Sequence, residues 1–101
     1  MTTANNSVHV VANLQVKPEH VAELASVLGE LARDSRLAPG NRRFEVHAHA
    51  ADATQVITLE QWDDAAAADA HMASPYVGAA LGKLGPLLAA PPQIVRYSPL
   101  A

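Results

Sequence analysis

The 101-residue sequence contains no cysteine, which excludes disulfide bonds, thiolate metal sites, iron–sulfur clusters and cysteine nucleophiles. It has only four aromatic residues, and 21 of its apolar residues are alanine. Because alanine buries little surface, a single copy would have a thin hydrophobic core. We therefore expect an oligomer.

Charged residues are also scarce, and basic residues do not outnumber acidic ones. Charged residues make up 17% of the chain and the formal net charge is −3, so we expect no nucleic-acid partner. Residues 1–11 contain no Lys or Arg and only a short apolar run, which predicts neither a signal peptide nor a membrane anchor. No segment approaches the roughly 20 apolar residues of a membrane span. These features predict a soluble, cytoplasmic protein with no membrane partner.

Hydrophobic periodicity predicts one α+β domain over residues 8–98, after a disordered tail at 1–7. The expected strands are 8–16, 43–49, 55–61 and 93–97, and the expected helices are 18–35, 64–73 and 76–88. Strand–helix–strand order occurs in each of two halves of roughly 45 residues. This order predicts a ferredoxin-like sandwich, in which helices cover one face of an antiparallel four-stranded sheet.

The other face of this sheet is predicted to mix polar and apolar side chains. Its expected members are His9, Val11, Asn13, Gln15, Arg43, Glu45, His47 and His49. A face of this mixed composition is better suited to contact with a second copy of the chain than to full exposure to water. We expect a homodimer whose two sheets close a barrel and supply the burial that the alanine-rich monomer lacks.

Most signatures of cofactor chemistry are missing from the sequence. No glycine-rich phosphate loop and no nucleophile elbow is present, so flavin and nicotinamide binding have no support. His47 and His49, with Glu45, share one side of a predicted strand and could ligate a divalent metal. An alternating polar strand gives the same pattern, however, and no further ligand is identifiable. We expect neither a metal nor a cofactor.

Three large side chains with polar tips surround one predicted alanine-rich helix. His71 lies in this helix, with Trp62 before it and Tyr76 after it, and the small residues 65–68 leave space beside them. Large residues next to small ones can form a ligand pocket. Alternatively, Trp62 is a core residue and His71 caps carbonyl groups at the helix end. The residues alone leave both interpretations open.

Four motifs, taken together, resemble the antibiotic biosynthesis monooxygenase family of dimeric α+β barrels. They are Val-x-Ala-x-Leu-x-Val-Lys-Pro at 10–18, Ser-Arg-x-x-Pro-Gly-Asn-x-x-Phe-Glu-Val-His at 35–47, Leu-Glu-x-Trp at 59–62 and His-x-x-x-Pro-Tyr at 71–76. Their order and spacing carry the resemblance, which runs from about residue 8 to residue 97.

The resemblance implies a cofactor-independent monooxygenase that oxidises a small electron-rich aromatic, a quinol or an anthrone, with O₂. The implied site residues are Trp62 as aromatic wall and N–H donor, His71 as base or hydrogen-bond partner, Tyr76 in the pocket and His47 as proton acceptor. Strand parity puts His47 opposite Phe44, which favours the dimer interface for His47 instead.

Other branches of the fold suggest different functions. A haem-degrading branch has its ligating histidine on the helix after the proline turn, where this sequence has no ligand at 77–81, so we expect no haem. Further relatives are isomerases or barrels that bind a small molecule without oxygenase activity. Arginines near the Pro39-Gly40 turn could bind an anion, as an isomerase requires, or could simply form surface ion pairs: Arg33, Arg36, Arg42 and Arg43.

Overall fold

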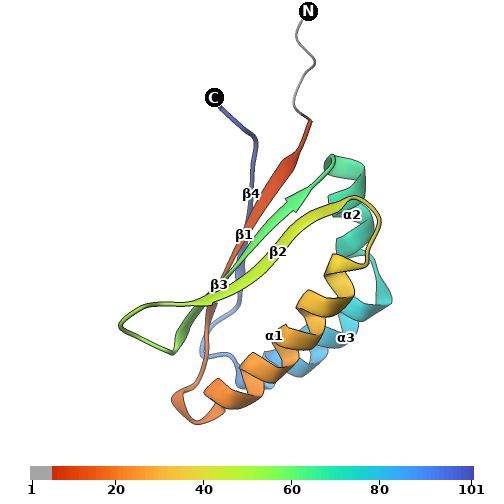
Figure 1. The fold of residues 1–101 in the computed structure, drawn as a ribbon. Helices are drawn as coiled ribbons and strands as arrows, with labels where there is room; N and C mark the ends of the chain where they lie inside the picture. Colours follow the sequence, from red (N-terminus) through yellow and green to blue (C-terminus); the bar gives the residue numbers. More distant parts are fainter. Residues whose placement is uncertain (1–5) are drawn as a thin grey trace, which may run out of the picture.

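The computed structural model describes residues 6–101, which form four strands, three α-helices and two short 3₁₀ helices (Figure 1). The elements follow in the order β1 (Val8–Gln15), η1 (Pro18–His20), α1 (Val21–Arg36), β2 (Asn41–Ala48), β3 (Gln55–Trp62), α2 (Ala65–Met72), α3 (Pro75–Leu84), η2 (Gly85–Leu87) and β4 (Gln93–Tyr97). Neighbouring strands are antiparallel in the order β2-β3-β1-β4. This confirms the predicted ferredoxin-like α+β fold.

One helix ends earlier than expected. The predicted helix over 76–88 ends at Leu84 and continues as the 3₁₀ turn η2, because Pro86 has no amide hydrogen with which to extend an α-helix. Of the predicted tail, residues 1–5 lie outside the described residues, and Ser7 is buried. No helix within residues 6–101 is both long and apolar enough to cross a membrane.

The helices cover one face of the sheet and leave the other face without a helix (Figure 1). Alternation in β1 turns Val10, Ala12 and Leu14 toward the helices, where all three are buried. The core divides into one cluster around Leu24 and Leu28 of α1 and a second cluster near α2. The buried members of the second cluster are Val10, Ala32, Phe44, Trp62 and Ala68.

A tight turn between α1 and β2 fixes the position of α2. Gly40 has a φ of 81°, in the left-handed region that favours glycine. A Cβ on Gly40 would lie 2.6 Å from the Cβ of Ala67 in α2. The Gly40 carbonyl accepts a hydrogen bond from the Asp63 amide at 2.8 Å. Glycine therefore allows the turn to approach α2 closely.

Candidate functional site

A buried carboxylate lies at the centre of the candidate site. The period of two in β3 turns Thr58, Glu60 and Trp62 toward the helices, and all three are buried. The Glu60 carboxylate accepts hydrogen bonds from Trp62 Nε1 at 3.0 Å and from Thr58 Oγ1 at 2.9 Å. Two donors from its own strand therefore hold this carboxylate in place.

His71 covers this carboxylate from the last turn of α2. Its ring is buried, with its centroid 4.3 Å from that of Trp62. Its Nδ1 lies 2.7 Å from the Tyr76 hydroxyl, and its Nε2 lies 3.7 Å from Glu60 Oε1. The structure thus brings together Trp62, His71 and Tyr76, three of the four predicted site residues, and adds Glu60.

The surroundings of the imidazole indicate where its hydrogen lies. A carboxylate only accepts hydrogen bonds, so Glu60 favours the hydrogen on Nε2 of His71. Nδ1 then accepts the hydroxyl hydrogen of Tyr76. We assign this tautomer from the contacts. In this tautomer Tyr76 donates a hydrogen bond to His71, whose N–H group is on the atom that lies 3.7 Å from Glu60 Oε1, beyond hydrogen-bond distance.

Burial shifts the ionisation of both groups toward their neutral forms. It raises the pKa of Glu60, against the hydrogen bonds from Trp62 and Thr58 and the charge of Arg96. Burial also lowers the pKa of His71 to about 4. Near neutral pH His71 is therefore an uncharged imidazole, whose one N–H group can donate a hydrogen bond.

An apolar cavity of about 50 Å³ lies between the sheet and the helices beside these groups. Its polar wall consists of Thr58, Glu60 and His71, and the rest of its lining is apolar. A wider surface cleft of about 400 Å³ lies against α2 and is also lined by His71 and Tyr76. His71 therefore borders both spaces.

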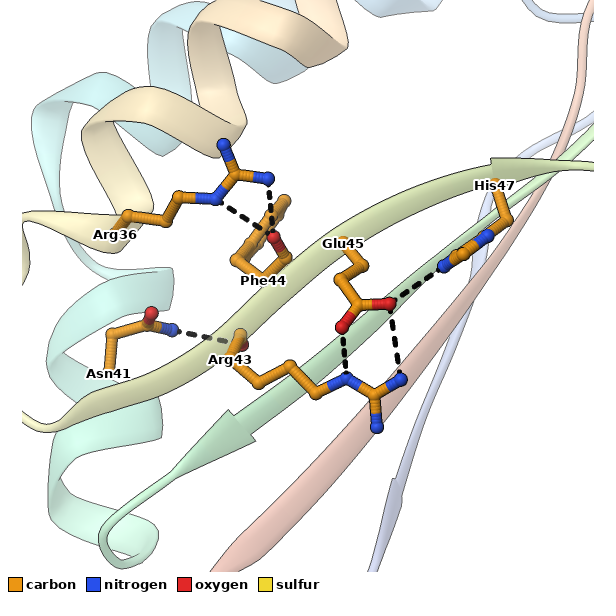
Figure 2. A network of polar contacts seen from close by, with 6 residues as sticks. All are labelled: Arg36, Asn41, Arg43, Phe44, Glu45 and His47. Carbon is orange, nitrogen blue, oxygen red and sulfur yellow. Dashed lines mark hydrogen bonds and ion pairs between the residues drawn. The ribbon is translucent and has the colours of Figure 1, made fainter.

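His47, the fourth predicted site residue, lies on the opposite face of the sheet. There Glu45 accepts hydrogen bonds from Nε and Nη2 of Arg43 at 2.6 and 3.1 Å, and His47 Nε2 lies 2.8 Å from Glu45 Oε1 (Figure 2). These contacts lower the pKa of Glu45 to about 2. His47 is exposed on the helix-free face, as strand parity predicted, and is not among the residues lining the Glu60 cavity.

The other candidate ligands are the strand residues proposed for a metal and the arginines near the Pro39-Gly40 turn. Within residues 6–101, no group of three or more His, Asp or Glu side chains is arranged to hold a metal ion. Arg36 donates from Nε and Nη2 to the Phe44 carbonyl at 3.1 and 2.9 Å (Figure 2). Arg42 pairs with Asp63, and Arg43 with Glu45. Three of the four arginines near the turn are thus already engaged.

The sequence interpretation missed Glu60 and Thr58. Both have the same strand parity as Trp62, which stands two residues after Glu60 in the Leu-Glu-x-Trp motif. If Trp62 faces the helices, Glu60 must do so as well. This parity was the signal that could have identified the buried carboxylate.

Comparisons with known proteins agree with the motifs. The sequence pattern of the family described as "Antibiotic biosynthesis monooxygenase" matches residues 7–83. "Putative monooxygenase YcnE" of Bacillus subtilis (strain 168) is 31% identical over 85 residues, which cover 84% of this chain and 90% of that protein.

Solved structures show the same fold. A "putative antibiotic biosynthesis monooxygenase" from Caulobacter crescentus CB15 has a TM-score of 0.89 at 26% identity, covering 96% of this chain and 92% of that one. Another, from Nitrosomonas europaea, has a TM-score of 0.91 at 20% identity, covering 99% and 96%. With the family pattern extending over most of its length, this chain belongs to the antibiotic biosynthesis monooxygenase family.

Proposed function

We propose that this protein is a cofactor-independent monooxygenase that oxidises a small electron-rich aromatic, a quinol or an anthrone, with O₂. The observation that carries the proposal is the buried Glu60 carboxylate beside the His71 imidazole, at the wall of an apolar cavity. The family and the monooxygenase names of its relatives support the class of reaction.

The proposed reaction needs no cofactor because the substrate is itself the reductant. Loss of a proton from an acidic hydroxyl or a benzylic carbon leaves an anion, which passes one electron to O₂. The aromatic radical and superoxide combine to form a C–O bond, and the peroxide then loses water. In sum, the CH₂ group of an anthrone and O₂ become a C=O group and H₂O, whereas a quinol and O₂ become a hydroxyquinone and H₂O. In both cases all the electrons come from the substrate.

Glu60 is the proposed base. A carboxyl group whose pKa is raised by burial is a stronger proton acceptor than an exposed one. His71, with its pKa near 4, is a weak base and serves better as an N–H donor to the anion and as a link to Tyr76. Phe44 supplies the aromatic wall of the cavity. Trp62, for which the sequence predicted that role, is fully buried outside the cavity lining and instead fixes the Glu60 carboxylate.

The cavity must widen before it can take an aromatic ring. Its volume of about 50 Å³ is well below the roughly 150 Å³ of a cavity that accepts benzene. Met72 lines the cavity and is 39% exposed. Because its side chain is unbranched and flexible, we expect it to move aside when the substrate enters.

We also propose a homodimer formed through the helix-free face of the sheet. This face carries half-buried apolar side chains, and Val95 and Tyr97 on it are 41% and 53% exposed. Its apolar members are Val11, Ile57, Leu59, Val95 and Tyr97. A second copy would remove this surface from water and compensate for the alanine-rich core.

Oxygen uptake tests the proposed function. Chelator-treated protein is mixed with a panel of quinols and anthrones, and spontaneous autoxidation is subtracted. We expect Glu60→Gln to lower kcat by about 100-fold or more, because it removes the base without changing the shape of the site. Glu23→Gln, on the exposed surface of α1, is the matched control and should retain kcat.

Either of two results would contradict the proposal. Uptake no faster than autoxidation, with the aromatics still bound, would favour a binding protein. Full activity of Glu60→Gln would show that another group accepts the proton.

A further inference from the structure

The cavity opens to solvent between β4 and the helix pair α2 and α3. Three of its lining side chains are large, apolar and exposed: Met72 and Leu81 at 39% and Ile94 at 42%. Met72 and Leu81 belong to the helices and Ile94 belongs to the edge strand. These side chains form the rim through which a ligand would reach Glu60.

A charged pair lies beside this apolar rim. Arg96 stands two residues after Ile94 on β4, and Asp69 stands three residues before Met72 on α2. Both spacings keep the paired residues on one face of their element. Arg96 Nη1 and Asp69 Oδ1 are 2.8 Å apart, so an ion pair spans from β4 to α2 next to the opening.

The strand register relates Arg96 to Glu60. Phe44, Glu60, Val10 and Arg96 are opposite one another across β2, β3, β1 and β4. Only Val10 separates Arg96 from Glu60 in this row, and both residues are on the helix-facing side. The positive charge of Arg96 accordingly offsets part of the rise that burial causes in the pKa of Glu60.

Breaking the ion pair between Asp69 and Arg96 requires little free energy. The Asp69 side chain is 68% exposed and that of Arg96 is 40% exposed, and exposed ion pairs contribute little to stability. A guanidinium group also binds a carboxylate with two parallel N–H groups. An anionic oxygen on a ligand in the rim could therefore take the place of Asp69.

We propose that Arg96 is a specificity-determining residue, which binds an anionic oxygen of an aromatic ligand at the mouth of the Glu60 cavity and is held there by Asp69 when no ligand is bound. The inference rests on the proposed function for the identity of the cavity as a ligand site. The ligand that we assign to the cavity is an aromatic molecule with a charged oxygen at the end that faces solvent.

Calorimetric titration with two probes of similar shape tests this assignment. One is 2-naphthoate, which is anionic, and the other is 2-naphthylmethanol, which is neutral. All titrations use one pH, and the two probes are compared within each variant, because Arg96 itself influences the pKa of Glu60. We expect the wild type to bind the anion about tenfold more tightly, since a charge-assisted bidentate contact is stronger than a neutral one.

Three variants separate the role of Arg96 from general damage. Arg96→Met should lose the preference while binding the neutral probe as before. Asp69→Asn should bind the anion more tightly than the wild type, because it removes the competing carboxylate. Arg42→Met, which breaks an exposed ion pair elsewhere, should keep the wild-type preference.

The inference is overturned if the wild type shows no preference for the anion, if Arg96→Met keeps it, or if neither probe binds. Its failure is distinct from failure of the proposed function. A preserved, Arg96-dependent preference without quinol oxidation would contradict only the oxygenase. Oxidation without that preference would contradict only the role of Arg96.

Discussion

Glu60 has a carboxylate that is buried under α2 and is held by Trp62 and Thr58. Burying an ionised carboxylate costs several kcal/mol unless hydrogen bonds and opposite charges compensate for it. An apolar residue of similar size would avoid that cost in an already thin core. The arrangement is easier to understand as a device for chemistry than as a contribution to stability, and perturbed carboxyl groups in cavities are typical of active sites.

His71 should make the stability of the protein depend on pH. Its pKa is about 4 when folded and near 6.5 when unfolded, so the unfolded chain binds more protons between these values. The free energy of unfolding should therefore fall as the pH drops from 6.5 to 4, by at most about 3 kcal/mol. The raised pKa of Glu60 acts in the opposite direction, since it favours the folded state as that carboxyl is protonated.

Urea denaturation of Glu60→Gln and of Glu60→Gln/His71→Gln across this pH range isolates the contribution of His71. The single variant should lose stability on acidification, and the double variant should lose clearly less. Glu60→Gln/His20→Gln, which replaces a partly exposed histidine, should follow the single variant. Identical slopes with and without His71 would contradict the assigned burial of its imidazole.

At the scale of elements, alternation and capping residues predicted most strands and helices correctly. Asp64 caps α2, since its side chain accepts the Ala67 amide at 2.8 Å. Trp62, His71 and Tyr76 also lie together, but Trp62 is a fully buried core residue, which is one of the two interpretations that the residues left open. Glu60 was missed, since a strand that buries a carboxylate does not follow the apolar–polar alternation on which the assignment depended.

The turn between α1 and β2 gives a testable prediction about how the elements pack. Gly40→Ala should lower the free energy of unfolding by about 1–3 kcal/mol, because it strains a left-handed residue and puts a methyl group against Ala67. Gly29→Ala, in the middle of α1 with open space around it, should raise that energy by up to about 1 kcal/mol. Chemical denaturation measures both. A Gly40→Ala protein as stable as the wild type would contradict the close contact between this turn and α2.

At the scale of the whole molecule, the sequence predicted the sandwich and its helix-free face but not the cavity. The volume beside Glu60 depends on how Met72, Leu81 and Ile94 pack around the gap between β4 and the helices. Packing of this kind joins side chains from elements that are distant in the sequence. The hydrophobic periodicity within one element therefore cannot predict it. Strand parity alone, however, did predict that His47 lies on the face of the sheet opposite to the helices.

The proposed dimer is tested by light scattering on a sizing column. We expect a mass of about twice 10.6 kDa at micromolar concentration. Val95→Lys puts a charge on the helix-free face and should shift the protein toward the monomer. Leu37→Lys, an exposed apolar position at the end of α1, should stay dimeric. A wild-type mass of 10.6 kDa would contradict the proposed interface.

The most direct test of the whole account is the fate of the two oxygen atoms during oxidation of a quinol or an anthrone under ¹⁸O₂. The account predicts one ¹⁸O atom in the organic product and one in water, with no flavin, haem or metal added and with Glu60→Gln nearly inactive. A product whose new oxygen comes from water, or no enzyme-dependent product for any member of the panel, would contradict it.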